Sequence, residues 1–572
     1  MSEKQNNEQL PHWNPSEVEK IKANSNYLRG TLVESFADEA TGSIAPGDTQ
    51  LIKFHGSYQQ TDRDLDEERR KQKLEPLFSF MIRARIPGGV VTADQWSEFD
   101  RLSEVYGNGT LKLTTRQAFQ IHCVLKRNFK KTIVAINNVL LDTISGSGDV
   151  NRNVMCTNNE GLSPIVPEVF EFSKKISEHL LPKSTAYHEI WLDKKLVAGG
   201  APDHEPIYGK TYLPRKFKIA IAIPPCNDTD LFSNDIGLIA IESNGELLGY
   251  NFAVGGGLGM TFGVEGTYPR LADVYGYVPK EKAIEVIEEI VKLQRDYGNR
   301  ENRRLARLKY TIDRLGVDVF KQKLEKRLGW KLEPVRSYRF DSNGDVYGWK
   351  EAASGKWFLG IFVEHGRVKD APDYSLKTGL AEVAKLKKSD FRLTGNQGLV
   401  IGNVEEKDKA EIEEILQRHN IWPGKHITGL RRNSIACVAL NTCGLAFAEA
   451  ERYLPSLNDK LDVILKDNDL DQDDILIRMT GCPNGCGRPY LGEIGFVGRA
   501  IGKYNLYLGA GFAGDRLNSL YKEMLSEEEI LKELKPIIED YANERVGNER
   551  FGHFVVRKRI VNPQPHVKIL KG

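Results

Sequence analysis

The stretch LKLTTRQAFQIHCV (residues 111–124) recurs in altered form as FRLTGNQGLVIGNV (residues 391–404). Aligned without gaps, the two stretches share Leu, Thr, Gln, Ile and Val at matching places. Each stretch is strand-like and precedes a segment with helical periodicity, KTIVAINNVLLD after the first and KAEIEEILQRHN after the second. The sequence therefore predicts that one small unit of sheet and helix occurs twice in the chain.

Two further matches support a duplication. RNVMC (152–156) resembles RNSIAC (432–437), with Cys156 opposite Cys437 if a one-residue gap is allowed, and YNFAVGGGLG (250–259) resembles YNLYLGAGFAG (504–514). The three matches keep the same order, and their separation of roughly 250–280 residues is far longer than a solenoid repeat. We expect two copies, each a smaller α+β unit followed by a larger one, with a ligand site where the copies meet.

Composition limits the classes of function. The 572 residues are 40% hydrophobic and 28% charged, and 80 basic against 79 acidic residues leave a net charge of +1. This balance gives no broad electrostatic footprint for nucleic acid. The N-terminus MSEKQNNEQLPHWNPSE lacks the apolar core of a secretory signal, and no run reaches the length of a membrane span. We expect a cytoplasmic protein without membrane or nucleic-acid partners.

Cysteines are few but unevenly placed. The first three are scattered and are predicted to be small core residues, whereas the last four form two pairs with five and three intervening residues, in the second copy only. In the cytoplasm such a cluster favours a metal or catalytic site over disulfides. In chain order the seven are Cys123, Cys156, Cys226, Cys437, Cys443, Cys482 and Cys486.

The two cysteine pairs favour an iron–sulfur cluster. A thioredoxin-like redox pair requires C-x-x-C, which neither spacing provides. The Cys482 pair suits zinc, but the five-residue spacing of Cys437 and Cys443 is wide for a zinc site. A 4Fe–4S cluster tolerates varied spacing and accepts hydrogen bonds from backbone N–H groups, which the glycine-rich loop CPNGCG (482–487) can supply. Zinc remains the alternative.

Basic residues concentrate in four short motifs of the first copy: MIRARIPGG (81–89), LKLTTRQ (111–117), VNRNV (150–154) and YLPRKFK (212–218). Strand alternation predicts that Arg83 and Arg85 share one face, and likewise Lys216 and Lys218. A solvated strand edge is the simplest explanation for any one motif. Because four occur among buried-strand patterns, we expect an internal anionic ligand, held by arginines and protonated by lysines.

No segment predicts a nucleotide cofactor. The glycine-rich stretch GGGLG (255–259) lacks the G-x-G-x-x-G spacing of a dinucleotide fold, and its counterpart GAGFAG (509–514) recurs in the other copy. We interpret both as tight turns near a ligand. Electrons for a reduction would then come from another protein.

Over essentially its whole length, from SNYLRGT (25–31) to FGHFVVR (551–557), the chain resembles the sulfite/nitrite reductase family. Within that family it is similar to the haemoprotein (beta) subunits of bacterial NADPH-dependent assimilatory sulfite reductases. The resemblance is carried by the two cysteine pairs and by TGCPNGCGRP (480–489) around the second pair.

The resemblance implies a trilobed, internally duplicated α+β fold with pseudo-twofold symmetry. Paired ferredoxin-like half-domains are expected at residues 76–145 and 346–424. A first sirohaem-facing domain is expected at 146–345, and the domain that binds the iron–sulfur cluster and sirohaem at 425–572. The polar arm, residues 1–75, is predicted either to wrap its own domain or to dock a partner.

The resemblance also implies a sirohaem coupled to a 4Fe–4S cluster. Cys486 matches the cluster ligand that is also the axial ligand of the sirohaem iron, and Cys437, Cys443 and Cys482 match the other cluster ligands. The family's substrate-binding residues match Arg83, Arg152, Lys216 and Lys218. Residues facing the carboxylates of the cofactor are expected at Arg116, Lys112, Gln120, His122 and Arg215.

The implied activity is the six-electron reduction of sulfite to sulfide for cysteine biosynthesis. The implied electron donor is a separate flavoprotein (alpha) subunit carrying FAD and FMN, which takes electrons from NADPH, and ferredoxin is the alternative. Nitrite reductase is the competing function, although relatives that reduce nitrite tend to carry Asn where this chain has Lys218. A colourless zinc-stabilised binding protein is the alternative from another class.

Overall fold

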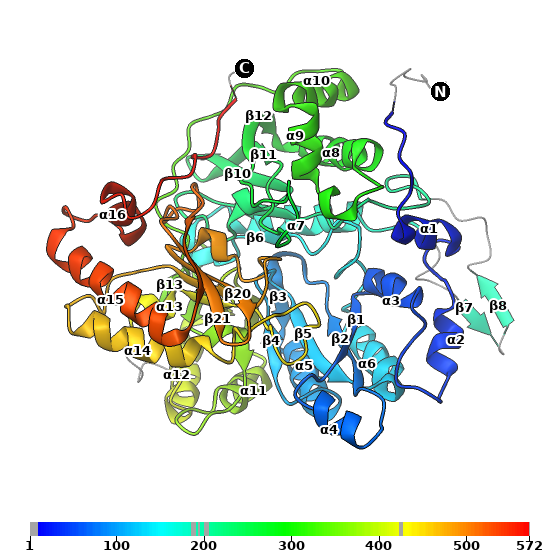
Figure 1. Ribbon diagram of the computed structural model, residues 1–572, viewed down its shortest axis with the longest axis horizontal. Helices are drawn as coiled ribbons and strands as arrows, with labels where there is room; N and C mark the ends of the chain where they lie inside the picture. Colours follow the sequence, from blue (N-terminus) through cyan, green and yellow to red (C-terminus); the bar gives the residue numbers. More distant parts are fainter. Residues whose placement is uncertain (1–9, 185–189, 193–194, 199–204, 422–426, 571–572) are drawn as a thin grey trace.

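The computed structural model describes residues 10–184, 190–192, 195–198, 205–421 and 427–570. Four five-stranded sheets, covered by helices, form the framework of the structure (Figure 1). A separate two-stranded hairpin is formed by β7 (Ile190–Leu192) and β8 (Lys195–Ala198). The four large sheets fall into two equivalent pairs, as the internal repeat predicts.

The two smaller sheets exchange one strand each. The first has the order β1 (Ser57–Thr61), β2 (Phe78–Arg83), β5 (Phe119–Val124), β4 (Leu111–Leu113), β15 (Arg367–Val368). The second has the order β13 (Gly348–Glu351), β14 (Trp357–Ile361), β17 (Leu399–Val404), β16 (Asp390–Leu393), β3 (Val90–Thr92). In the first sheet Val368 pairs with Leu111, and in the second Val91 pairs with Phe391, so each sheet ends on a strand from the other copy.

One core joins the two smaller sheets. Helices α5 (Ala93–Val105) and α11 (Leu376–Leu386) pack against each other, and the buried ring of Trp96 stacks on Phe391 at 4.5 Å between centroids. Thr92 begins α5 with a capping box, its hydroxyl accepting from the N–H of Gln95. The outer helices are α6 (Lys126–Asn138) and α12 (Lys409–Arg418). The half-units thus form one continuous layer rather than two separate domains.

The two larger sheets share a second topology, in which the first three strands are parallel and the rest antiparallel. The first contains β6 (Met155–Cys156), β9 (Ile219–Ala222), β10 (Ile236–Ser243), β11 (Glu246–Val254) and β12 (Asp273–Pro279). The second contains β18 (Ser434–Ala436), β19 (Ile477–Thr480), β20 (Ile494–Ala500), β21 (Lys503–Leu508) and β22 (Ser519–Leu525). Their inner strands, β9 and β19, are fully buried, which explains their continuous apolar pattern.

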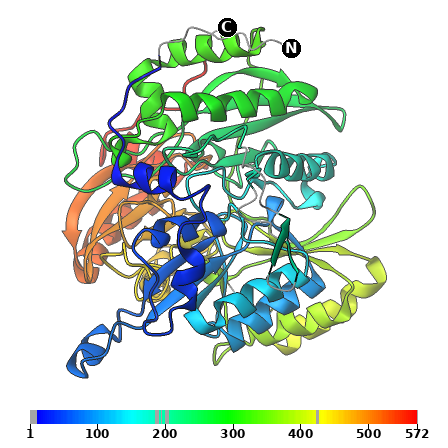
Figure 2. The same cartoon turned by 90° about the vertical axis from the view of Figure 1, so that its right-hand side faces the viewer.

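The remaining helices cover these sheets or link them, as the two views in Figures 1 and 2 show. In the first copy they are α7 (Val166–His179), α8 (Ala283–Tyr297), α9 (Leu308–Leu315) and α10 (Val317–Leu328). In the second copy they are α13 (Gly429–Arg432), α14 (Leu454–Lys466), α15 (Glu527–Glu544) and α16 (Phe551–Arg557).

Strand register corrects one part of the predicted repeat. Cys156 pairs with the first copy's inner strand, and its N–H donates to Gln117 Oε1 at 3.0 Å. Ala436 does the same in the second copy, donating to Gln397 Oε1 at 3.1 Å. The prediction that Cys156 mirrors Cys437 is therefore wrong: the two segments align without a gap, and Cys156 corresponds to Ala436.

The N-terminal arm wraps its own chain. It contains α1 (Glu17–Asn24), α2 (Leu32–Ala37), α3 (Asp48–Leu51) and α4 (Asp66–Lys71). Leu28, Leu51 and Phe54 are buried in the core of the first large unit, and the ammonium of Lys22 donates to the carbonyl of Leu213 at 2.8 Å. Only α4, which has no buried residue, projects from the body (Figure 2). Docking of a partner on the arm stays a prediction.

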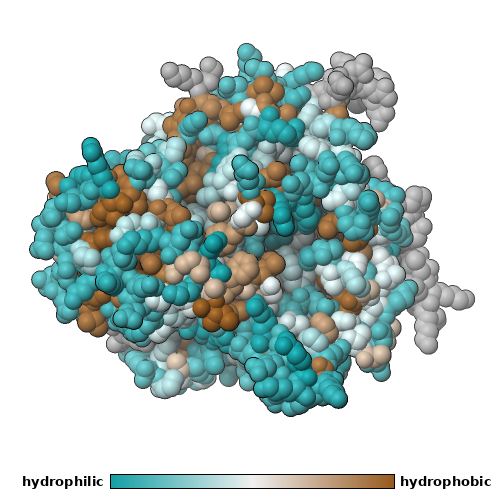
Figure 3. All heavy atoms as spheres, in the orientation of Figure 1, coloured by the Kyte–Doolittle hydropathy of each residue, from teal (hydrophilic) through white to brown (hydrophobic). Residues whose placement is uncertain are grey.

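Hydrophilic residues cover most of the face shown in Figure 3, and hydrophobic patches are scattered across it. Among the described residues, no helix combines the length and the apolar character that a membrane crossing requires.

Candidate active site

A cavity lies where the two copies meet, with an empty volume of about 450 Å³ that includes the part open to solvent. Five of its lining residues are arginine or lysine, and no aspartate or glutamate is among the described residues that line it. The lining comprises Thr115, Arg116, Met155, Lys216, Lys218, Thr229, Ser233, Asn234, Leu258, Gly259, Arg307, Asn484, Gly485, Cys486 and Arg488. The cavity is therefore built to receive an anion.

Arg116 enters the cavity from the turn between β4 and β5. Its Nη1 and Nη2 donate to Asn234 Oδ1 at 3.0 and 2.9 Å, which fixes the guanidinium with a neutral partner. Its buried Nε has no hydrogen-bond partner among the described residues. Burial, with help from Arg152, lowers the pKa of Arg116 to about 9. A buried, incompletely satisfied cation is costly, and an anionic ligand would remove that cost.

Lys216 and Lys218 lie just before β9, and both line the cavity as the strand alternation predicts. Burial, together with Arg215, Arg152 and other cations nearby, lowers the pKa of Lys216 to about 7. Burial and the neighbouring Arg116 and Lys216 also hold the pKa of Lys218 well below its usual value. The Lys216 ammonium can thus give up a proton near neutral pH, as a general acid requires, and the shift at Lys218 acts in the same direction.

Arg83 and Arg152 lie beside this group. Arg83, at the end of β2, donates to the carbonyl of Gly146 at 3.2 Å, and Arg152 donates through Nε to the carbonyl of Gly148 at 3.2 Å. Burial is the main cause of a lowered Arg83 pKa, to which Arg152 adds, while the Cys486 sulfur partly offsets it. Cys486 thus acts electrostatically on Arg83, Lys216 and Lys218, and Arg152 acts on Arg83 and Lys216. Of the four residues predicted to hold substrate, Lys216 and Lys218 line the cavity, and Arg83 and Arg152 lie outside its lining.

Arg85 does not share the surroundings of Arg83, although strand alternation predicts that it would. Its Nε donates to Asp142 Oδ1 at 3.0 Å and its Nη1 to Ser177 Oγ at 3.1 Å. β2 ends at Arg83, so the strand alternation that predicted a shared site no longer applies at Arg85.

The four clustered cysteines come from two loops of the second copy. Gly481 N–H donates to Cys437 Sγ at 3.4 Å and Asn484 Nδ2 to Cys482 Sγ at 3.5 Å, so the sulfurs already accept hydrogen bonds. Burial, reinforced by the other thiols, raises the pKa of Cys437 and of Cys482 to about 12. Cys486 is the exposed member, and it lines the cavity.

The other residues predicted to face the cofactor are arranged differently. The buried ammonium of Lys112 is bound to Glu451 and to the carbonyl of His365, so it lies outside the cavity lining. With its amide oriented to satisfy both neighbours, Gln120 accepts from Arg83 Nε at 2.8 Å and donates to His122 Nε2 at 3.2 Å. Burial, with Lys112 and Arg83, lowers the pKa of His122 to about 3 and keeps it neutral. These residues support Arg83 rather than face the open space.

Arg215 lies in the same basic surroundings. Burial and then Arg303 lower the pKa of Arg215 to about 10, with Asp149 acting in the opposite sense. Its charge also helps to lower the pKa of Lys216.

Two cations of the cavity were not predicted from the sequence. Arg307 lines the cavity and binds Asp235, with its Nη2 2.8 Å from Oδ2. Arg488 also lines the cavity and lies inside the signature TGCPNGCGRP, two residues after Cys486. Arg307 belongs to the arginine-rich stretch ENRRLARLK (301–309), which was the available signal.

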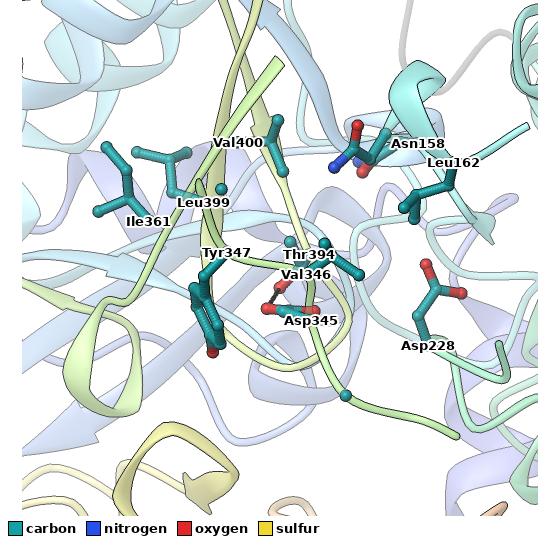
Figure 4. Close-up of a pocket in the computed structure, with 13 residues that line it drawn as sticks. Asn158, Leu162, Asp228, Asp345, Val346, Tyr347, Ile361, Thr394, Leu399 and Val400 are labelled. Atoms are coloured by element: carbon teal, nitrogen blue, oxygen red, sulfur yellow. Dashed lines mark hydrogen bonds between the residues drawn. The ribbon is translucent and has the colours of Figure 1, made fainter. Parts of the chain in front are cut away.

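A second cavity occupies the pseudo-twofold-related place and contains carboxyl groups where the first cavity contains cations (Figure 4). It contains Asp228 and Asp345 and no lysine or arginine among its described lining residues. Asp228 lies eight residues before the first residue of β10, as Cys486 lies eight before the first of β20. Gly360 occupies the register position that Arg83 holds in the first copy.

The two carboxyl groups of the acidic cavity accept hydrogen bonds from neighbouring threonine hydroxyls. Thr157 Oγ1, which follows β6 as Cys437 follows β18, donates to Asp228 Oδ1 at 2.7 Å. Thr394 Oγ1 donates to Asp345 Oδ2 at 2.5 Å. Burial, reinforced by the nearby carboxylate of Asp345, raises the pKa of Asp228 to about 7. Threonine and aspartate thus replace thiols, and this half lacks the means to hold a cluster or an anionic cofactor.

The donor set fits the two groups that the sequence implies. Four sulfurs from neighbouring loops act on one another electrostatically, as the ligands of one iron–sulfur cluster require. No three His, Cys, Asp or Glu side chains in the described part of the chain surround a single metal position, the four thiols included. The thiol of Cys486 faces a cavity rich in cations, which suits a sirohaem bearing several carboxylates.

Comparisons with known proteins agree with this arrangement. The model of the nitrite and sulphite reductase 4Fe–4S domain matches residues 171–332, and that of the nitrite/sulfite reductase ferredoxin-like half domain matches 73–138 and 350–419. The 4Fe–4S match falls on the first copy, outside all four clustered cysteines.

Curated relatives extend the match along the chain. The chain is 58% identical to the sulfite reductase [NADPH] hemoprotein beta-component of Anoxybacillus flavithermus, over 96% of this chain and 97% of the relative. It is also 58% identical to the component of the same name from Staphylococcus saprophyticus, over 95% and 96%. The structure of Mycobacterium tuberculosis NirA superposes with a TM-score of 0.76 at 24% identity, over 96% of this chain and 97% of that one, which shows a shared fold.

Proposed function

Because the chain belongs to the nitrite and sulphite reductase family, we propose that it is the haemoprotein component of an assimilatory NADPH-dependent sulfite reductase. Its reaction is the six-electron reduction of sulfite to sulfide at a sirohaem coupled to a 4Fe–4S cluster. The observation that carries the proposal is the exposed thiol of Cys486 in a cavity that has five cations and, among the described residues that line it, no aspartate or glutamate.

Each cofactor has protein groups suited to hold it. Cys437, Cys443, Cys482 and Cys486 are the cluster ligands, and the cavity cations Arg116, Arg307 and Arg488 neutralise carboxylates of the sirohaem. When bound, the two cofactors supply the electrons for the reduction. The chain contributes charge balance, orientation and protons.

The basic residues have two further roles, anion binding and proton donation. Arg83 and Arg152 keep their charge and hold the oxygens of the anion. Lys216 and Lys218, whose pKa values are lowered by burial, donate protons as oxygen leaves. Each oxygen takes two protons and two electrons and departs as water, so three oxygens account for the six electrons. Burial makes these charges more effective than they would be in water.

The electron donor is an alpha-component, as the names of the relatives imply. We assign FAD and FMN to that partner because this sequence contains no segment that resembles a nucleotide-cofactor site. A ferredoxin is the other candidate donor.

The deciding experiment measures sulfide from sulfite with the purified, sirohaem-containing protein. One arm supplies NADPH and the flavoprotein, a second supplies reduced ferredoxin, and a third replaces sulfite by nitrite. We expect sulfide with the flavoprotein and a higher kcat/KM for sulfite than for nitrite. A colourless, iron-free protein that folds normally and cannot be reconstituted would overturn the enzyme proposal, and a strong preference for nitrite would overturn the substrate.

A further inference from the structure

Tyr58 belongs to the N-terminal arm but contacts two residues of the proposed substrate site, Arg83 and Arg152. It is the second residue of β1, which pairs antiparallel with β2, so that Tyr58 lies opposite Met81. β2 ends two residues later at Arg83, a proposed substrate residue. The arm therefore contributes a phenol to a site otherwise built from the duplicated core.

Three cations surround the phenol. Arg152 Nη2 donates to Tyr58 Oη at 3.3 Å. The Arg83 guanidinium lies 5.9 Å from the ring centroid, and the Lys53 ammonium lies 5.8 Å from it. The cations come from three separate places: the end of β2, the segment before β6, and the short 3-10 helix η1 (Ile52–His55). Such surroundings favour a phenolate.

The pKa of the Tyr58 phenol is lowered by these cations. Burial alone would raise the pKa of Tyr58, but Arg152, Arg83 and Lys53, with a hydrogen bond from Ser147, reverse the shift and hold the pKa at about 8. Other buried tyrosines behave in the opposite way: burial raises the pKa of Tyr208 far above its usual value. The low value therefore follows from the three cations, two of which are proposed to hold sulfite.

The second copy lacks this phenol. The position equivalent to Tyr58 is Lys350 of β13, which is exposed and pairs with Phe358 as Tyr58 pairs with Met81. The phenol occurs only in the copy that has the basic residues, which favours a role in the site over a role in folding.

We propose that Tyr58 is a further catalytic residue, whose phenol gives a proton to an oxygen leaving sulfite. The proposal rests on the proposed reduction of sulfite. The phenol O–H bond breaks, the S–O bond of the anion breaks, and the oxygen takes this proton and a second one from a lysine to leave as water. The electron pair comes from the partner through the bound cofactors and stays on sulfur. Arg152, Arg83 and Lys53 hold the phenolate until solvent returns its proton.

The test is Tyr58→Phe in the cofactor-loaded protein, because this change removes one oxygen and keeps the ring. We expect kcat for sulfite to fall about 10- to 100-fold, within the usual range for a lost proton donor. KM should change less than threefold, and sirohaem content should stay the same. The matched control is Tyr208→Phe, which removes a buried hydroxyl that donates to the carbonyl of Leu180 at 2.7 Å and accepts from the backbone N–H of Asn151 at 3.3 Å.

A pH profile separates catalysis from structure. The proton donor must be protonated, so the wild-type rate should fall as pH rises through about 8, and this step should be missing in Tyr58→Phe. The groups facing Tyr58 are Arg152, Arg83 and Lys53, and a lower step from Lys216, whose pKa is about 7, should remain in both proteins.

A readout independent of turnover is the near-ultraviolet difference titration of wild type against Tyr58→Phe. We expect a single phenol titrating near pH 8, and no such difference against Tyr208→Phe. If Tyr58→Phe keeps kcat within twofold with an unchanged pH profile, or if no phenol titrates near pH 8, the proposal is overturned. Failure of the wild type to form sulfide would instead refute the proposed function.

Discussion

Asp230 and Arg488 occupy equivalent positions in the two copies and form a buried ion pair, with Arg488 Nε 3.1 Å from Asp230 Oδ2. Each lies six residues before its strand, β10 or β20, and each has left-handed backbone angles, with φ of 47° and 54°. Arg478 Nη1 also donates to Asp230 Oδ2, at 2.6 Å. The pseudo-twofold relation thus pairs opposite charges at the base of the loop that carries Cys486.

Asp230→Asn should destabilise the protein. The change leaves the buried guanidinium groups of Arg478 and Arg488 without their anion, which costs about 3–5 kcal/mol in comparable buried pairs. Chemical denaturation measures the loss, and the visible spectrum shows whether the Cys486 loop still holds the cofactors. Asp341→Asn is the control, because its pair with Arg339 is exposed and worth roughly 1 kcal/mol or less. Equal stability of both variants would contradict the prediction.

Asp228→Asn should stabilise the protein at alkaline pH, whereas Asp230→Asn destabilises it. The folded protein raises the pKa of Asp228 to about 7, so the folded state binds a proton that the unfolded state has released. Below about pH 4 the Asp228 carboxyl therefore does not lower the free energy of unfolding. It lowers this free energy progressively as pH rises, and most above about pH 7.

At pH 8 we expect the Asn variant to be more stable than wild type by roughly 2–4 kcal/mol, since one pKa unit corresponds to about 1.4 kcal/mol. At pH 4.5 the two should differ little, because Thr157 can still donate to the amide oxygen. Denaturation midpoints at the two pH values check the sign. A variant that is less stable than wild type at pH 8 would show that the carboxylate is needed.

Cys486→Ser should lose the coupled cofactors. Its thiol is the one that lines the cavity, and a serine hydroxyl is a poor iron ligand. We expect bound iron and sirohaem to fall together, with loss of the visible absorption and at least a 100-fold drop in sulfite reduction, of the order seen when a transition-state group is removed. Cys226→Ser, a half-buried cysteine outside the cavity lining, should keep the spectrum. An unchanged spectrum in Cys486→Ser would contradict the assignment.

Lys218→Ala should slow turnover more than it weakens cofactor binding. Four other cations still line the cavity, whereas a proton donor contributes a factor of about 100 or more. The measurement is kcat for sulfite against sirohaem content per chain. Lys174→Ala, which removes an exposed lysine paired with Glu171, is the control for the loss of a positive charge. A rate unchanged in Lys218→Ala would refute the proton-donor role.

The sequence predicts the parts of this structure that local pattern controls. The repeat around Thr114 and Thr394, the clustered cysteines and the paired lysines each depend on residues close together in the chain, so spacing alone reveals them. Arg307, Arg488 and Tyr58 depend on contacts between distant segments, which no periodicity encodes. The strand exchange escaped for the same reason, because β3 and β15 are short and each pairs with a strand of the other copy.

The charge of each cavity also depends on contacts between distant segments, which the sequence pattern does not show. The sequence shows that Asn396 replaces Arg116 in the second copy, and predicts a lost ligand there. It does not show that Asp228 stands where Cys486 does, because the surrounding letters differ and only strand register aligns them. The difference between the basic residues of one cavity and the carboxyl groups of the other is therefore recognised from equivalent strand positions and not from sequence similarity.

The exchange of β3 and β15 has a consequence for the origin of the chain. A single copy on its own would leave its small sheet one strand short, with a bare edge beside β4 or β16. A single-copy ancestor therefore needed a second identical chain to supply that strand, which describes a domain-swapped homodimer. In the present chain the two halves differ at these places, because Thr157 and Asp228 stand in one half where Cys437 and Cys486 stand in the other.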